Sequence, residues 1–184
     1  KTMGYPMVEN LAGPLIATRE GLLTAGSKAA AQYFDVCDQS MFYEVVRLVD
    51  GLPLFWDDHC RRLIASVGDL FTVDTDLLLA RSLELVTALG SEFLKSNLRL
   101  VVHKDDFVIH LSPAYYPSDA QFATGVPVTL LWQERKTPNI KTIDPDYKDA
   151  VARGFAAGGP FGPPFELLLV NRDGNITEGS RSNV

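Results

Sequence analysis

Alternating apolar and polar residues around a tight turn form the clearest pattern in the chain. Residues 42–56 read FYEVVRLVDGLPLFW, and alternation divides the first strand into two faces. One face holds Tyr43, Val45 and Arg47, and the other holds Phe42, Glu44, Val46 and Leu48. Asp50-Gly51 follows, and both positions of a two-residue hairpin turn favour positive φ. The pattern predicts a hairpin with a tyrosine and an arginine on the same face.

The next residues predict two helices and a second strand pair. Residues 57–71 place apolar side chains at helical spacing, with Asp57 or Asp58 as the N-cap, and residues 75–94 form a second helical pattern. Residues 97–112 predict two strands that turn at Lys104 to Asp106. The segment PAYYPSDAQFATG is rich in turn formers, so we place a domain boundary near residue 120.

After this boundary the pattern predicts a strand at 126–133, a helix at 146–158, and strands at 166–171 and 175–179. The fold class is therefore α+β, with domains at 1–120 and 121–184. A domain of roughly 60 residues is small for a core of its own, so we expect the chain to be a piece of a longer protein. Periodicity favours core positions for Phe42, Phe55 and Trp132.

Composition excludes several classes of partner. The net charge of -6 argues against nucleic acid or an anionic membrane, and the apolar runs are shorter than the ~20 residues of a spanning helix. The sequence lacks CxxC, HExxH and clustered histidines, so we expect no metal site. With two cysteines and no visible secretory signal, we expect a cytoplasmic protein that binds small molecules.

Two lysines, Lys141 and Lys148, lie seven positions apart around Pro145. A lysine that reacts must be partly neutral, which requires desolvation or a neighbouring cation. Lys141 follows an apolar strand and lies between Ile140 and Ile143, whereas Lys148 falls in a predicted helix. Position therefore favours Lys141, and a solvated surface lysine is the alternative.

Glu178 is the candidate carboxylate of the last stretch, NRDGNITEGSRSN. It ends a predicted strand and precedes a glycine and serines, a setting typical of a carboxylate in a polar pocket. A capping or turn glutamate is the alternative.

Four stretches in a fixed order resemble the class IV, or fold type IV, pyridoxal-phosphate enzymes. This family includes branched-chain and D-amino-acid aminotransferases and aminodeoxychorismate lyase. The stretches are FYEVVRLVDGLPLFWDDHCRRL, YYPSDAQFATGVPV, PNIKT and ITEGSRSNV. The resemblance implies a two-domain fold, with a small N-terminal α/β domain and an incomplete cofactor domain.

The resemblance also implies roles for individual residues. Lys141 corresponds to the Schiff-base lysine, Glu178 to the partner of the pyridine nitrogen, and Arg62 to the arginine that holds the cofactor phosphate. Further cofactor positions are Ser180, Asn183 and, in an offset register, Tyr147. The substrate positions are Tyr43, with Arg47 on its face, and His103. The D-amino-acid enzymes carry a substrate-binding arginine in a threonine-arginine-glycine stretch that VVHKDDFVIH lacks; His103, Lys104, Arg99 or His110 could substitute for it, and an ordinary strand-end residue is the favoured interpretation for all but His103.

The activity implied is transfer of an amino group between an amino acid and a 2-oxo acid, with pyridoxal 5'-phosphate as cofactor, in a homodimer. Two alternatives remain open. One is a lyase that uses the same lysine to release pyruvate from an aminodeoxychorismate-like substrate. The other is a scaffold homologue without activity, which retention of Lys141, Glu178 and Arg62 argues against.

Overall fold

The computed structural model describes residues 4–37, 40–93, 95–104, 106–135 and 140–182. The chain divides into two compact units, Lys1–Ala114 with Asn139–Ile143, and Tyr115–Pro138 with Asp144–Val184. The segment that carries Lys141 therefore belongs to the first unit. The domain boundary expected near residue 120 stays a prediction about the intact protein.

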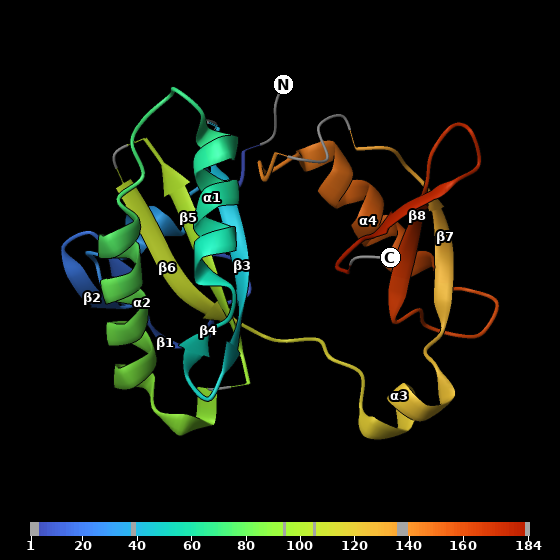
Figure 1. The fold of residues 1–184 in the computed structure, drawn as a ribbon, viewed down its shortest axis with the longest axis horizontal. Helices are drawn as coiled ribbons and strands as arrows, with labels where there is room; N and C mark the ends of the chain where they lie inside the picture. Colours follow the sequence, from blue (N-terminus) through green and yellow to red (C-terminus); the bar gives the residue numbers. More distant parts are fainter. Residues whose placement is uncertain (1–3, 38–39, 94, 105, 136–139, 183–184) are drawn as a thin grey trace. The chain divides into compact units, whose positions relative to one another are not determined.

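The first unit is built on an antiparallel sheet of six strands in the order β2-β1-β6-β5-β3-β4 (Figure 1). The strands are β1 Ala12–Thr18, β2 Gly21–Thr24, β3 Phe42–Val49, β4 Leu52–Pro53, β5 Asn97–His103 and β6 Asp106–Ser112. The pairs β3–β4 and β5–β6 confirm the two predicted hairpins. The β1–β2 hairpin had no counterpart among the predicted elements.

The backbone conformation of the β3–β4 turn explains why Asp50-Gly51 predicts a hairpin. Asp50 and Gly51 have φ values of 51° and 78°, as a two-residue hairpin turn needs. The alternation of β3 is also confirmed, because Phe42, Glu44, Val46 and Leu48 are buried whereas Val45 and Arg47 are exposed. One charged side chain, Glu44, thus lies on the apolar face.

Two helices, α1 Trp56–Val67 and α2 Thr75–Leu89, contribute apolar side chains to the core on this face. Leu63 and Leu85 are fully buried against strand residues such as Val46 and Leu100. The expected N-cap is wrong: Phe55 precedes α1 in a left-handed conformation, and Asp57 and Asp58 lie in its first turn. Negative charge there still interacts favourably with the helix N-terminus.

A second apolar cluster covers the other face of the sheet. Its buried members come from the N-terminal segment, β1 and the strand pair, and are Met7, Val8, Ile16, Ala30, Tyr33, Met41, Val101 and Val108. The short 3₁₀ helix Ala31–Tyr33 belongs to this layer, and a second one, Ser91–Phe93, follows α2. Both faces of the central strands are therefore buried.

The second unit has a three-stranded sheet in the order β7-β8-β9, in which β7 and β8 are parallel and β9 is antiparallel. Its elements are α3 Asp119–Thr124, β7 Val128–Trp132, α4 Pro145–Ala157, β8 Glu166–Val170 and β9 Ile176–Gly179. A Cβ on Gly154 would lie 2.7 Å from Leu167 Cδ1, so glycine allows α4 to approach β8 closely. Three predicted strands and one predicted helix are confirmed here.

Helix α3 corrects the expectation of an irregular turn-rich segment. Ser118 and Gln121 form a reciprocal capping box, in which each side chain bonds the other residue's backbone N–H. The S-x-x-Q spacing is a known helix start signal. Ser118 therefore begins a helix here, although it follows Pro117 in a segment rich in turn formers.

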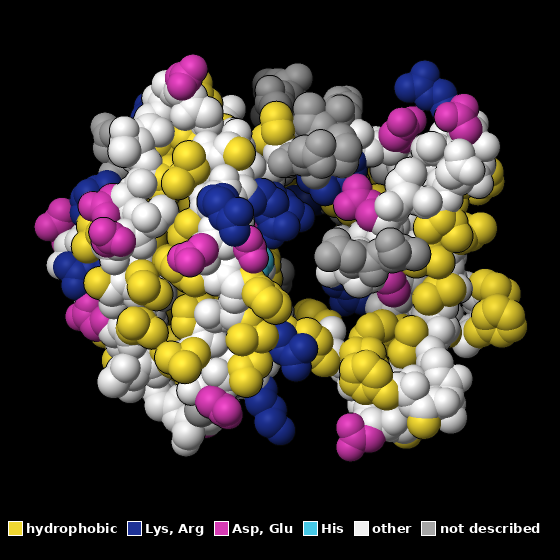
Figure 2. Space-filling view, in the orientation of Figure 1, with side chains coloured by type: hydrophobic (Ala, Val, Ile, Leu, Met, Phe, Trp, Pro, Cys, Tyr) yellow, Lys and Arg dark blue, Asp and Glu magenta, His cyan; other side chains and the backbone are white. Residues whose placement is uncertain are grey.

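Apolar side chains remain exposed along β7. Leu130 and Trp132 are 51% and 69% exposed, and yellow side chains lie over this strand in Figure 2. The core prediction is therefore wrong for Trp132 and for Phe55, which is 73% exposed, and correct for Phe42. Periodicity shows which residues share a face, but it does not show what covers that face.

Within the described residues, no helix is both long and apolar enough to cross a membrane.

Neighbouring valines on β3 offer a matched test of the fold. Val46 is fully buried and Val45 is 38% exposed. We expect Val46→Ala to lower the free energy of unfolding by about 2 kcal/mol, because it leaves a cavity, and Val45→Ala by about 0.5 kcal/mol. Urea unfolding measures both. Equal losses would contradict the assignment of the two faces.

Candidate active site

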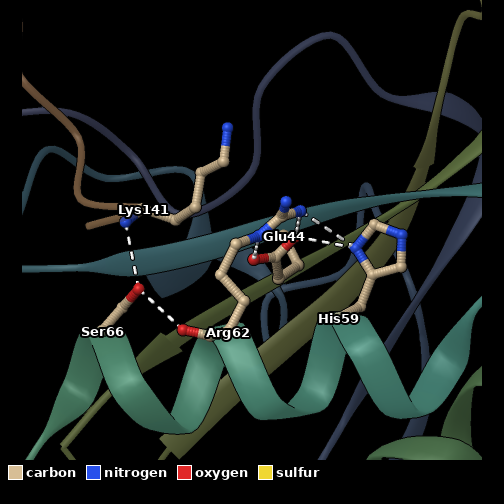
Figure 3. Close-up of polar contacts among 5 residues, drawn as sticks. All are labelled: Glu44, His59, Arg62, Ser66 and Lys141. Carbon is tan, nitrogen blue, oxygen red and sulfur yellow. Dashed lines mark hydrogen bonds and ion pairs between the residues drawn. The ribbon is translucent and has the colours of Figure 1, made fainter. Parts of the chain in front are cut away.

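The site begins with Glu44, the charged residue on the buried face of β3. Its side chain is fully buried, so it requires partners. Arg62 Nε donates to Oε1 at 2.6 Å, Arg62 Nη2 donates to Oε2, and His59 Nδ1 lies 2.8 Å from Oε2. This bidentate contact ties α1 to β3 (Figure 3).

Helical spacing places His59, Arg62 and Ser66 on one face of α1, because they lie three and four positions apart. The Ser66 hydroxyl donates to the Arg62 carbonyl at 2.8 Å and accepts from the Lys141 backbone N–H at 3.1 Å. The Lys141 carbonyl in turn accepts from the Tyr43 N–H at 2.9 Å. The backbone of Lys141 is thus held between α1 and β3.

Neighbouring residues hold the same segment. Thr142 forms a bridge with Phe42, its hydroxyl donates to the Met41 carbonyl at 3.2 Å, and the Ile143 N–H donates there at 3.3 Å. In Figure 3 Arg62 extends from α1 to the Glu44 carboxylate, and the Lys141 side chain extends away from α1. Hydrogen bonds thus fix the backbone of residues 141–143.

The ionisation of this cluster follows from its contacts. Burial alone would raise the pKa of Glu44, but hydrogen bonds from Arg62 and His59 and their charges outweigh it, so the pKa is lowered. The hydrogen bond to Glu44 raises the pKa of Arg62. At neutral pH the pair is an ion pair, and the Arg62 side chain keeps 45% of its surface exposed.

The predicted substrate residues lie on the other face of β3 and on β5. Tyr43 pairs with Val101, so His103, two residues further along β5, is its diagonal neighbour at about 7 Å. His103 also has its Nδ1 3.0 Å from the Ser40 carbonyl. Arg47 lies four residues along β3, about 13 Å from Tyr43, and is exposed. Tyr43 therefore lies closer to His103 than to Arg47.

A second polar cluster lies in the other unit and contains Glu178. Arg135 Nη1 lies 3.3 Å from Glu178 Oε2, and its guanidinium lies 5.5 Å from the centre of the Tyr147 ring. The Tyr147 hydroxyl donates to the Ser180 carbonyl at 3.3 Å. Three predicted cofactor residues, Glu178, Tyr147 and Ser180, thus belong to one network joined by Arg135.

The candidates therefore form two groups, one in each unit. Lys141, Arg62, Tyr43, Arg47 and His103 belong to the first unit, and Glu178, Ser180 and Tyr147 to the second. Asn183 lies outside the described residues. The pairing of Lys141 with Glu178 across the units stays a prediction.

Several residues of the site were not identified from the sequence. Glu44 and Ser66 hold Arg62 and Lys141, and Arg135 holds Glu178. A glutamate on the apolar face of a strand is a signal for Glu44, because a buried charge needs a partner. Ser66 follows Arg62 by four residues, which is a helical spacing. No comparable signal points to Arg135, which is distant in sequence from Glu178.

Each unit holds side chains that fit one part of a phosphorylated aromatic aldehyde. In the first unit, Arg62 offers a planar fork of N–H groups that suits phosphate oxygens, and Lys141 offers a primary amine that can react with an aldehyde. In the second unit, Glu178 offers a carboxylate that can pair with a protonated ring nitrogen. Among the described residues, no three His, Cys, Asp or Glu side chains form a group that could hold a metal ion.

Comparison with known proteins decides the family. The profile of the family Amino-transferase class IV matches residues 41–184. The chain belongs to the class IV aminotransferases. Proteins of this family depend on pyridoxal phosphate. No curated protein sequence matches the chain.

Solved structures show the same fold type IV architecture. A protein from Thermotoga maritima, assigned as a branched-chain amino acid aminotransferase, matches with a TM-score of 0.68 and 17% identity over 90% of this chain and 60% of its own. A hypothetical aminotransferase from Mycobacterium tuberculosis, bound to α-ketoglutarate and PMP, matches with a TM-score of 0.67 and 16% identity, over 91% of this chain and 65% of its own. The 4-amino-4-deoxychorismate lyase from Pseudomonas aeruginosa matches with a TM-score of 0.57 and 18% identity, over 86% of this chain and 61% of its own. The chain thus spans 60% to 65% of the length of these three proteins.

The buried carboxylate of Glu44 supplies a test of the cluster. Glu44→Gln leaves the Arg62 charge without its partner, so we expect a loss of about 2 kcal/mol of unfolding free energy at pH 7. Because the pKa of Glu44 is lowered in the folded state, its stabilisation is present above the ordinary glutamate pKa and is lost as pH falls through the lowered value. The difference between wild type and Glu44→Gln should therefore narrow in acid.

Urea unfolding at stepped pH measures this difference. Glu84→Gln is the matched control, because Glu84 pairs with Arg81 on the surface and should contribute less than about 0.5 kcal/mol. A Glu44→Gln protein as stable as Glu84→Gln at pH 7 would refute the role of Glu44.

Proposed function

We propose that this chain is the lysine-bearing part of an aminotransferase that moves an amino group between an amino acid and a 2-oxo acid with pyridoxal 5'-phosphate. The observation that carries the proposal is the placement of Lys141 beside Arg62. Ser66 joins the backbones of these two residues, with hydrogen bonds of 2.8 and 3.1 Å. Family membership supports the cofactor.

Arg62 would hold the cofactor phosphate. Its Nε and Nη2 groups bond Glu44, which fixes the plane of the guanidinium. An arginine has five N–H donors, and the 45% exposure of this side chain leaves an edge for phosphate oxygens. Glu44 and His59 then act as positioning residues, because they hold the arginine rather than the phosphate.

Lys141 would be joined to the cofactor aldehyde and would later act as the base. When bound, pyridoxal phosphate supplies an electron sink that absorbs the electron pair released as the substrate Cα–H bond breaks. Once substrate displaces it, the Lys141 amine would take the proton from Cα and deliver it to C4′ of the cofactor. Its backbone is fixed by Ser66 and Tyr43, so the amine moves on its side chain alone.

Glu178 would keep a proton on the ring nitrogen. A carboxylate beside this atom stabilises the protonated ring, and Arg135 orients that carboxylate through its 3.3 Å contact. Tyr147 and Ser180 belong to the same network and, with Asn183, would line the cofactor. The proposal requires Glu178 and Lys141 to face one cofactor in the intact protein.

Tyr43 and His103 would contact the substrate, with Arg47 at the outer end of the same strand face. A histidine N–H and a tyrosine hydroxyl can each donate to a carboxylate, which both amino acids and 2-oxo acids carry. The free cysteines Cys37 and Cys60 support a cytoplasmic location, and the resemblance to the family supports a homodimer. The matched lyase structures keep a pyruvate-releasing lyase as the second candidate, since these lyases share the fold.

Absorption spectroscopy tests the lysine. With added pyridoxal phosphate, we expect the protein to show a visible band that borohydride abolishes, and Lys141→Ala to lack this band. Lys148→Ala is the control, since this lysine lies seven residues away in α4, and the variant should keep the band. A band retained in Lys141→Ala and lost in Lys148→Ala would overturn the assignment.

Dependence on a 2-oxo acid tests the reaction. An aminotransferase completes its cycle only with an amino acceptor, so we expect steady turnover of an amino acid to stop when the 2-oxo acid is left out. Coupled assays for the new amino acid and for pyruvate separate the two candidates. Pyruvate release from aminodeoxychorismate without any acceptor would favour the lyase.

A further inference from the structure

Glu166, the first residue of β8, is a buried carboxylate outside the residues assigned to the site. Its exposed fraction is 6%, although it is charged and forms no ion pair with any Lys, Arg or His of the described residues. A buried carboxylate without a cation must be stabilised by hydrogen-bond donors. The donors that surround Glu166 therefore indicate its structural role.

Four donors meet this carboxylate, two at each oxygen. Oε1 accepts from the Ser180 hydroxyl at 2.5 Å and from the Leu167 N–H at 2.8 Å. Oε2 accepts from the Ser182 hydroxyl at 2.7 Å and from the Arg181 N–H at 3.2 Å. Three of the four donors belong to the turn 180–182, which directly follows Glu178 and Gly179.

The same turn is closed by backbone bonds and by close packing. The Gly179 N–H donates to the Ser182 carbonyl at 2.9 Å, and the Ser180 N–H donates to the Leu167 carbonyl at 2.8 Å. A Cβ on Gly179 would lie 2.4 Å from Ser182 Oγ and 3.1 Å from Glu166 Oε2. Glycine at this position therefore permits the serine hydroxyl to reach the carboxylate.

We propose that Glu166 is a positioning residue that anchors the turn 179–182 and so fixes Glu178 and Ser180 for the cofactor. This inference rests on the proposed function, because it assigns the turn to a pyridoxal-phosphate site. The Ser180 hydroxyl donates a hydrogen bond to Glu166. Ser180 therefore shapes the turn rather than donating a hydrogen bond to the cofactor phosphate.

The anchor requires a carboxylate rather than an amide. A backbone N–H meets each oxygen, Leu167 at Oε1 and Arg181 at Oε2. In Glu166→Gln, either orientation of the amide turns an NH₂ group toward one of these N–H groups, which leaves two donors facing each other. Burial alone would raise the pKa of Glu166, but bonds from Ser180, Ser182, Leu167 and Arg181 outweigh it and lower the pKa, which agrees with an ionised anchor.

The experiment compares Glu166→Gln with two controls in the same unit. Glu134→Gln removes a charge from an exposed pair with Arg172, and Val170→Ala creates a small cavity at the end of β8 where Val170 pairs with Ile176, away from the turn. Amide hydrogen exchange without cofactor reports on the turn, and titration with pyridoxal phosphate gives its Kd. We expect Glu166→Gln to speed exchange at the Ser180 and Arg181 amides and to raise the Kd about tenfold, with both controls near wild type.

Ser182→Ala provides a second variant in case Glu166→Gln does not fold. Ser182 is exposed, and its replacement removes one of the two donors to Glu166 Oε2. We expect amide exchange and the Kd to change in the same direction as in Glu166→Gln, but by less. Unchanged exchange at these amides, or faster exchange with an unchanged Kd, would overturn the inference. A wild-type chain that binds no pyridoxal phosphate would count against the proposed function instead, because amide exchange tests the anchor separately.

Discussion

A buried carboxylate on an apolar strand face is the constraint on which the candidate site depends. Glu44 lies among Phe42, Val46 and Leu48 on the core side of β3, where a lone charge would be costly. Its bidentate contact with Arg62 satisfies that charge and fixes the rotation of α1 against the strand. The rotation in turn presents Ser66 to the backbone of Lys141. One ion pair thus links the packing of the core to the placement of the Lys141 backbone.

The second unit uses the same principle with different donors. Glu166 is also buried on a strand, but hydroxyl and backbone N–H groups satisfy it instead of a guanidinium. The segment it holds carries the proposed ring-nitrogen partner. Within the described residues, the ion pair of Glu178 is with Arg135. In both units a buried carboxylate therefore holds the backbone or side chains of half-buried candidate site residues.

Local patterns in the sequence account for most of the fold but for only part of the site. Asp50-Gly51, the alternation of β3 and the spacing along α1 each depend on near neighbours, so they were predicted correctly. The capping box of α3 was equally local and was missed because prolines and serines around it suggested a turn. Trp132 and Phe55 were misplaced because exposure depends on what covers an element. Ser66 with Lys141, and Arg135 with Glu178, join positions 75 and 43 residues apart, which no local pattern encodes.

The central claim is that Lys141 carries the cofactor. Borohydride reduction of the protein with bound pyridoxal phosphate fixes the cofactor on its lysine, and peptide mass spectrometry then locates the label. The account predicts one dominant phosphopyridoxyl group, on the peptide that contains Lys141. A label on Lys148 instead, or spread evenly over surface lysines, would contradict it.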